Sequence, residues 1–169
     1  MNKTERKMVD VIRRGREDYG VLSVKAEFEA EGTRTDDLLR LVEITRRADV
    51  SLTVKIGGCE AIRDLLEAKQ IGVQSIVAPM VESPYALTKF IAAKNHVFSE
   101  DEQLDTTFLF NVETLPSVHC IADLVEAARG TTGVQGVVFG RVDLTGSMGL
   151  SRSDVNSRTV TDLAIKAAE

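Results

Sequence analysis

The sequence predicts an α/β fold of the TIM (β/α)8-barrel type, in which parallel strands alternate with helices. Short apolar runs with strand character alternate with stretches whose apolar residues recur every three or four positions. This alternation is typical of a parallel sheet with crossover helices. The polar residues of each apolar run fall at its C-terminal end, where barrels and open α/β sheets place their active sites.

We expect five strands, and the last three read as the nearly continuous apolar runs of strands that are buried on both faces. The predicted strands span residues 20–28, 51–56, 74–80, 106–112 and 134–139.

Helices are expected between the strands because apolar residues recur there at helical spacing. Thr35 and Asp36 suit the N-cap of the first one. The stretch from His96 to Asp105 is polar and acidic and is predicted to be a surface loop. One predicted helix begins at residue 35, and the other four span residues 60–69, 84–95, 117–129 and 157–169.

The length of 169 residues predicts a single domain, residues 1–169. A closed barrel needs eight strands, and only five or six β/α units are visible, so we expect a barrel that is incomplete at its C-terminus. Either the last units are missing from the chain, or a partner chain covers the open edge of the sheet.

Composition excludes several classes of function. Apolar residues make up 43% of the chain and charged residues 28%, the balance of a soluble globular protein. A net charge of −5 disfavours nucleic acid as a partner. No apolar run approaches the roughly 18 residues needed to span a bilayer, and the first residues lack a signal-peptide core, so we expect a cytoplasmic protein without membrane contact. Cys59 and Cys120 form no C-x-x-C pair and are interpreted as small buried thiols.

Glu113 and Asp143 follow consecutive predicted strands and are candidate metal ligands. Right-handed crossovers would bring both to the same end of the sheet. A hard cation such as Mg²⁺ commonly takes one or two protein carboxylates together with water and substrate oxygens. The alternative for either acid is a helix N-cap or an ion pair.

The segment from Gly140 to Gly149 contains three glycines together with Thr145 and Ser147. Such a segment frees backbone N–H groups to face an anionic ligand, and a carboxylate could dock there. A plain tight turn is the alternative. The segment matches neither a Walker nor a dinucleotide-binding fingerprint.

Three motifs in this order resemble the HpcH/HpaI aldolase and citrate lyase β-subunit family. Ile76 to Ser83 (IVAPMVES) resembles the strand that lines its pocket, and Asn111 to Thr114 (NVET) resembles its metal-binding strand end. Gly140 to Gly149 (GRVDLTGSMG) resembles the segment that supplies the second metal ligand, and it is the most specific of the three. Together the motifs lie within residues 20–150.

The resemblance implies a metal-dependent carbon–carbon lyase that forms or cleaves a bond next to the enolate of pyruvate or an acyl-CoA. The cofactor implied is Mg²⁺ or Mn²⁺, held by Glu113 and Asp143, whose Lewis acidity stabilises the enolate. The implied partners are a small 2-oxo acid, hydroxy acid or acyl-CoA substrate, together with further copies of the chain in a homo-oligomer. The implied substrate-binding residues are Asn111, Gly140, Arg141, Leu144 and Thr145.

Two departures from the family set this sequence apart. Lys55 stands where the family usually has an arginine on the substrate oxygen, and a lysine cannot grip two oxygens through a planar fork. Glu27, Glu29 and Glu31 follow the first strand without the histidine that the aldolases carry there. The resemblance therefore makes Lys55 and either Glu27 or Glu29 the catalytic candidates, with solvated glutamates as the alternative.

Other interpretations remain open. One is a non-catalytic barrel that binds an oxo acid or a phosphosugar, which the missing histidine and Lys55 would favour. Another is a phosphoenolpyruvate-using transferase or mutase-like barrel. His96 and His119, the two histidines of the chain, fall outside the strand ends and are expected to be structural or surface residues.

Overall fold

The computed structural model describes residues 1–130 and 132–168. Its centre is a parallel sheet of five strands, which confirms the predicted α/β fold and the number of strands. Each strand is shorter than its sequence pattern, and the fourth, which keeps six of its seven predicted residues, comes nearest to it. The strands are β1 (Ser23–Glu27), β2 (Ser51–Lys55), β3 (Ser75–Ala78), β4 (Thr107–Val112) and β5 (Gly136–Phe139).

The strands lie in the order in which they occur in the chain, β1-β2-β3-β4-β5, and all neighbours are parallel. The register places Glu27 beside Lys55 and Val112 beside Phe139. The carboxyl ends of all strands therefore meet at one edge of the sheet. Residues that follow different strands can act on one ligand there.

The core lies between the sheet and its helices. The face of the sheet that the helices cover is its outer face. The strand residues on this face are apolar and, apart from those at the sheet edges, fully buried. They include Leu52, Val54, Ile76, Ala78, Phe108, Phe110 and Val112. Each buried large aliphatic or aromatic side chain stabilises the fold by roughly 1.5–3 kcal/mol, so this face dominates the stability of the domain.

The opposite, inner face of the sheet is mixed: it carries charged and polar residues on β1, β2 and β4, and apolar ones such as Val77 and Leu109. Lys25 and Glu27 of β1 alternate with the outer-facing residues and lie beside Thr53 and Lys55 of β2 in the register. Asn111 occupies the corresponding face of β4. In a barrel of this kind the inner face lines the interior, and here its charged side chains, Lys25, Glu27 and Lys55, lie toward the carboxyl ends of β1 and β2.

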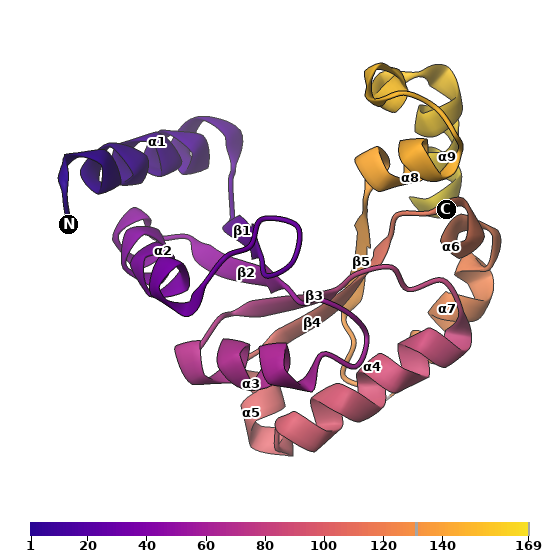
Figure 1. The fold of residues 1–169 in the computed structure, drawn as a ribbon, viewed down its shortest axis with the longest axis horizontal. Coiled ribbons are helices and arrows are strands. Elements are labelled where there is room, and N and C mark those ends of the chain that lie inside the picture. The colour runs from indigo at the N-terminus through magenta and orange to yellow at the C-terminus, as the bar shows by residue number, and fades with distance from the viewer. Residues whose placement is uncertain (131, 169) are drawn as a thin grey trace.

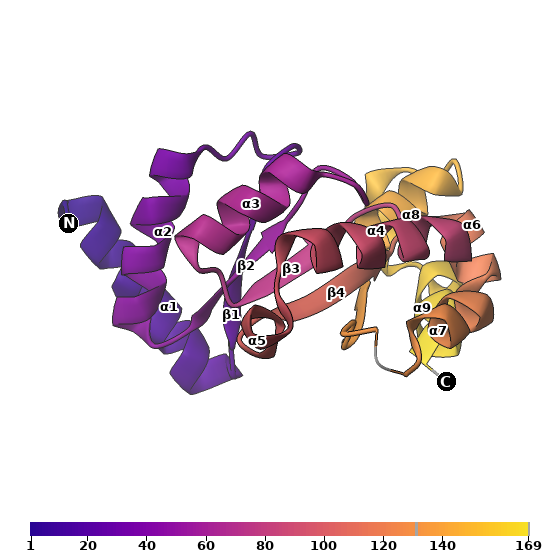
Figure 2. The same cartoon turned by 90° about the horizontal axis from the view of Figure 1, so that it is seen from below.

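The helices cover the outer face. Helices α2 to α7 lie along one side of the sheet, whereas α1 and the α8–α9 pair lie beyond its two ends (Figure 1). Figure 2 shows α3 and α4 lying across the central strands. The helices are α1 (Lys3–Tyr19), α2 (Thr35–Ala48), α3 (Ile62–Ile71), α4 (Pro84–Val97), α5 (Glu100–Leu104), α6 (Leu115–His119), α7 (Ile121–Ala128), α8 (Arg141–Ser147), the 3₁₀ helix η1 (Arg152–Asn156) and α9 (Arg158–Ala168).

Besides α8 and η1, two helices, α1 and α5, were not expected from the sequence. Helix α1 buries only Val9, which packs with Ile44 and Ala48 of α2. The apolar face of α1 is therefore narrow, and the many charged residues of the helix obscure it in the sequence. Helix α5 interrupts the predicted loop 96–105 and begins with a capping box between Ser99 and Glu102. The predicted helix 117–129 is instead two short helices, α6 and α7, that meet at Cys120.

The sheet is an incomplete barrel. Its described strands end at β1 on one side and β5 on the other, and Val137 on β5 is 41% exposed. Among the described helices, none is both long and apolar enough to cross a membrane.

Candidate active site at the carboxyl edge of the sheet

Glu113 follows β4 directly and is held by hydrogen bonds at both carboxylate oxygens. Its Oε1 accepts from the backbone N–H of Met80 at 2.9 Å, and its Oε2 accepts from Asn111 Nδ2 at 2.6 Å. The residue is only 2% exposed. Two donors from two different strand ends therefore fix one orientation of this carboxylate.

Gly140 makes room for Glu113. A Cβ atom at residue 140 would lie 2.5 Å from Glu113 Cβ and 2.8 Å from Glu113 Oε2, closer than packed atoms can approach. The backbone N–H of Gly140 donates to the Val112 carbonyl at 3.0 Å and so extends the β4–β5 pairing beyond the strands. Residue 140 has to be a glycine because the Glu113 side chain occupies the space that a side chain at residue 140 would need.

Met80 adopts an unusual backbone conformation next to this carboxylate. Its φ is +50°, one of two positive values at non-glycine residues among those described. This conformation costs a non-glycine residue roughly 1–2 kcal/mol. Met80 follows β3 and Pro79 directly. In this conformation its backbone N–H donates to Glu113.

Asp143 lies in the first turn of α8, beyond β5, and its side chain is exposed. It makes no hydrogen bond or ion pair with the described residues. The pKa of Glu113 is raised, mainly because the carboxyl group is buried, and the negative charge of Asp143 raises it further. The Met80 N–H, Lys55 and Asn111 each act to lower this pKa. The charge of Asp143 thus acts on Glu113 across the carboxyl edge of the sheet.

The residues present fit a hard divalent cation. Glu113 and Asp143 supply carboxylate oxygens, the donors that Mg²⁺ and Mn²⁺ prefer. Asn111 Oδ1 is buried without a hydrogen-bond partner in the described structure, an acceptor that faces a missing donor or cation. Within the described residues no group of three or more acids, cysteines and histidines could hold a metal by itself. Water and substrate oxygens would have to complete the coordination.

Glu27 links two lysines on the inner face. Its Oε1 lies 2.5 Å from Lys25 Nζ, and its Oε2 lies 3.0 Å from Lys55 Nζ. Burial alone would raise the pKa of Glu27, but the two lysines outweigh it, and the pKa lies below its usual range. A carboxylate held ionised by two ammonium groups is a poor proton carrier, so the geometry favours a positioning role over the predicted acid–base role.

Lys55 stays charged in this environment. Burial would lower the pKa of Lys55, but Glu27, Glu113 and Asp143 together raise it above its usual range. The Lys55 side chain is only 12% exposed. It keeps a largely buried positive charge on Glu27, within the electrostatic reach of the two candidate metal ligands, and this charge would stabilise an anionic substrate oxygen.

Glu29 is exposed and packs across Gly57, at the end of β2. A Cβ at residue 57 would lie 2.8 Å from Glu29 Cγ. Within the described residues the Glu29 carboxylate has no hydrogen bond or ion pair. The third glutamate, Glu31, instead accepts from the backbone N–H of Glu27 at 3.2 Å.

The predicted glycine-rich turn at residues 140–149 is largely the helix α8. Leu144 and Thr145 are fully buried, and Thr145 Oγ1 donates to the Arg141 carbonyl within the helix. Their side chains face the interior, so any substrate contact at these positions would have to come from the backbone. Arg141 donates to the Val155 carbonyl at 3.2 Å and to Thr161 Oγ1 at 2.8 Å, which ties α8 to η1 and α9.

The remaining candidates lie away from this edge or have local partners. His96 lies in the last turn of α4 rather than in a loop, and His119 ends α6; both are exposed. Cys59 and Cys120 are free and partly buried. Each thiol points at a carbonyl of the β3–α4 connection, Pro79 for Cys59 and Glu82 for Cys120.

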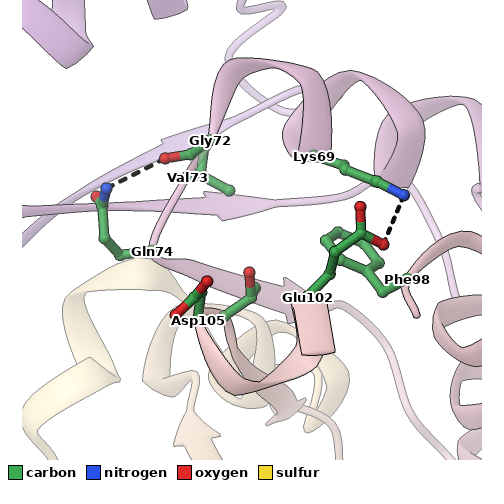
Figure 3. A pocket seen from close by; sticks show the side chains of 8 residues that line it. Lys69, Gly72, Val73, Gln74, Phe98, Glu102 and Asp105 are labelled. Carbon is green, nitrogen blue, oxygen red and sulfur yellow. Dashed lines mark hydrogen bonds and ion pairs between the residues drawn. The ribbon is translucent and has the colours of Figure 1, made fainter. Parts of the chain in front are cut away.

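A separate cavity of about 280 Å³ lies at the amino ends of β3 and β4, opposite the candidate site (Figure 3). Its wall carries the ion pair between Lys69 and Glu102, at 2.8 Å, and the ring of Phe98, 5.6 Å from the ammonium group. Hydrogen bonds from Lys69 and from Ser99 lower the pKa of Glu102 to about 2. These groups satisfy one another, and in barrels this end of the sheet serves stability.

Sequence reasoning missed two groups of the site. Lys25 could have been found, because a strand has a period of two and Lys25 shares its face with Glu27. The Met80 N–H could not, because no side-chain pattern reveals which backbone donor a distant carboxylate will use.

Comparison with known proteins agrees with this architecture. The family profile described as HpcH/HpaI aldolase/citrate lyase matches residues 29–168. An HpcH/HpaI aldolase from Desulfitobacterium hafniense DCB-2 is 17% identical, with a TM-score of 0.73, over 94% of this chain and 67% of its own. The citrate synthase SbnG gives the same identity and TM-score over 96% and 67%. A family protein from Burkholderia cenocepacia J2315 is 14% identical, with a TM-score of 0.72, over 96% and 70%.

No functionally curated protein matches this chain. The curved parallel sheet and its charged carboxyl edge define a TIM-barrel-type α/β protein that covers about two thirds of the neighbouring structures. The chain belongs to the HpcH/HpaI aldolase/citrate lyase family, whose members are enzymes of the lyase and synthase kind.

Proposed function

We propose that the protein is a metal-dependent carbon–carbon lyase that cleaves or forms a bond next to the enolate of a 2-oxo acid or an acyl-CoA. One observation supports this most directly: Glu113 is fixed by two hydrogen bonds in the same electrostatic environment as the unpaired Asp143 and the charged Lys55. Glu113 and Asp143 would hold Mg²⁺ or Mn²⁺. When bound, the metal would supply Lewis acidity that stabilises negative charge on the substrate.

The chain's own groups would act around that charge. Lys55 would donate a hydrogen bond to the substrate oxygen that becomes negative as the carbon–carbon bond breaks. Glu27 would position Lys55, because it accepts from it at 3.0 Å. Glu29, which has no partner in the described structure, would accept the hydroxyl proton when an aldol bond is cleaved; the bonding electrons remain on the enolate, whose carbon then takes up a proton.

The decisive experiment follows the exchange of the pyruvate methyl protons in D₂O by NMR, with Mg²⁺ or Mn²⁺ and after chelation. We expect metal-dependent exchange in the wild type and a loss of at least tenfold in Glu113→Gln and Asp143→Asn, since each removes a charged ligand. Glu100→Gln, an exposed acid in the first turn of α5, is the matched control and should exchange normally. Exchange that persists without metal, or in both ligand variants, would refute the proposal.

A non-catalytic oxo-acid-binding barrel is the second candidate, favoured by the position of both histidines away from the site. Calorimetry distinguishes the two. Pyruvate or oxalate binding that is independent of metal and accompanied by no proton exchange would favour binding without turnover.

The homo-oligomer and the cytoplasmic location stay predictions. An oligomer would cover the exposed sheet edge at β5. A light-scattering mass equal to one chain would contradict it.

A further inference from the structure

Helices α1 and α2 lie side by side (Figure 1), and a cavity of about 450 Å³ opens between them and the β1–α2 connection, residues 28–34. Its apolar wall is formed by Met8 of α1 and by Leu41 and Ile44 of α2. Cavities of this size that combine an apolar wall with a few charged groups are typical of small-molecule sites. This cavity shares no lining residue with the candidate active site.

The charged lining of the cavity is unbalanced. It consists of Glu5, Glu31, Asp37 and Arg40. Arg40 pairs with Glu5 at 3.2 Å, and Asp37 lies 3.6 Å from the guanidinium group of Arg34. Glu31 forms no ion pair with any other described residue. The cavity therefore keeps one negative charge that no cation of the protein offsets, and it lies on Glu31.

Two residues of the cavity wall hold the backbone of Glu27. Glu31 Oε2 accepts from the Glu27 N–H at 3.2 Å, and the Thr33 N–H donates to the Glu27 carbonyl at 3.3 Å. The Glu27 side chain in turn pairs with Lys55 at 3.0 Å. A ligand that contacts Glu31 or Thr33 therefore acts on the residue that positions Lys55.

We propose that this cavity binds a small organic cation, an amine with an apolar body, and that the bound cation acts on Glu27 through Glu31. The ammonium group pairs with the Glu31 carboxylate, whose second oxygen makes no hydrogen bond within the described structure. The apolar body covers Met8 and Leu41. An exposed ion pair contributes little by itself, so the apolar contact has to supply much of the affinity. The inference goes beyond the proposed function and does not rest on it.

The same lining disfavours other classes of ligand. A hard metal ion needs several oxygen ligands, and among the described residues no group of three or more acids, cysteines and histidines could hold one. An anion would approach Arg40, but this guanidinium group is already paired with Glu5, and the charge of Glu31 would repel the anion. An organic cation is the class that matches both the charge and the apolar wall.

The test is a ¹H–¹⁵N NMR titration of the metal-free protein with phenethylamine, 2-phenylethanol and 3-phenylpropionate. The three ligands share a phenyl ring on a two-carbon chain, and their end groups are cationic, neutral and anionic. Phenethylamine should shift the amide signal of Glu27 saturably, with the same dissociation constant as the signals of Thr33 and Leu41 in the cavity wall. The other two ligands should bind about fivefold more weakly or worse, since an exposed ion pair supplies a factor of this size.

Two variants and a matched control locate the site. Glu31→Gln removes the charge but keeps an oxygen that can accept from the Glu27 N–H, so phenethylamine should bind it about fivefold more weakly. Met8→Lys places an ammonium group at the cavity and should also weaken binding. Val125→Lys, on α7, introduces the same charge at a residue that is 39% exposed, compared with 38% for Met8, and should leave binding unchanged.

Each outcome decides one part of the inference. If 3-phenylpropionate binds as tightly as phenethylamine, or if Glu31→Gln and Met8→Lys bind phenethylamine like the wild type, the cation site is wrong. If phenethylamine binds without moving the Glu27 amide signal, the coupling to Glu27 is wrong. The titration contains neither metal nor oxo acid, so its result is independent of the pyruvate exchange that tests the lyase proposal.

Discussion

A Cβ atom placed on Gly140 would lie 2.5 Å from the Cβ of Glu113. The glycine after β5 and the glutamate after β4 are therefore fitted to each other across neighbouring strand ends. The orientation of the candidate metal ligand depends on a residue that carries no side chain.

Gly140→Ala should weaken metal binding. The added methyl group would push the Glu113 carboxylate off the Met80 N–H, and such overpacking costs about 1–3 kcal/mol. We expect at least a tenfold loss of Mn²⁺ affinity, measured by calorimetry. Gly146→Ala is the matched control, because residue 146 lies in α8 with nothing within 4 Å of its added Cβ. Equal affinities in the two variants would show that Gly140 does not set the Glu113 orientation.

Met80 should tolerate glycine better than a β-branched residue. Glycine keeps the N–H that donates to Glu113 and removes the strain of φ +50°, whereas valine increases the strain. Met80→Val should therefore lose more metal affinity than Met80→Gly, and unfold about 1–2 kcal/mol more easily. Denaturant unfolding and Mn²⁺ titration measure both effects. The reverse order would mean that the backbone at residue 80 is not a constraint on the site.

The ion pair between Lys69 and Glu102 should make stability pH-dependent in the acid range. The pKa of Glu102 is about 2 in the folded protein and near 4.5 in the unfolded chain. Its stabilisation is complete above the unfolded value and is lost as the pH falls from about 4.5 toward 2. The difference in Tm between wild type and Glu102→Gln should thus be largest at neutral pH and shrink at pH 2–3. Glu100→Gln, on the same helix, should show no such dependence.

Lys94 should limit stability at neutral pH. It is fully buried on α4, where Nζ bonds Asn95 Oδ1 at 2.6 Å and Gln103 Oε1 at 2.5 Å and lies 5.1 Å from the Phe108 ring centre. Burial lowers the pKa of Lys94, so the unfolded chain binds the proton more tightly. Stability from this residue therefore increases as the pH rises through the lowered pKa toward the unfolded value near 10.5.

Lys94→Met should flatten this increase, since methionine has a similar length and no charge. The measurement is the free energy of unfolding at pH 7 and pH 9.5. Lys7→Met, on the exposed face of α1, serves as the control. Parallel pH profiles for wild type and Lys94→Met would contradict the assignment.

The order of the elements and the residues that end the strands could be predicted from the sequence. Parallel strands buried under helices need continuous apolar runs, so β3, β4 and β5 could be located from the runs of consecutive apolar residues in the sequence. The placement of Glu113 and Asp143 at one edge followed from the topology of crossovers. The resemblance to the HpcH/HpaI family, based on three motifs, is confirmed by the match over residues 29–168.

The contacts of these residues could not be predicted, because they arise when the chain folds. The segment 140–149 contains three glycines and predicts a turn, but residues 141–147 form a helix because Leu144 and Thr145 are buried in the interior. The sequence predicts a Glu27 that carries a proton, but in the structure this carboxylate forms ion pairs with Lys25 and Lys55. The alternation of residues along a strand predicts which side chains share a face of the sheet. Hydrogen bonds and ion pairs between strands depend on distances that exist only once the sheet has formed.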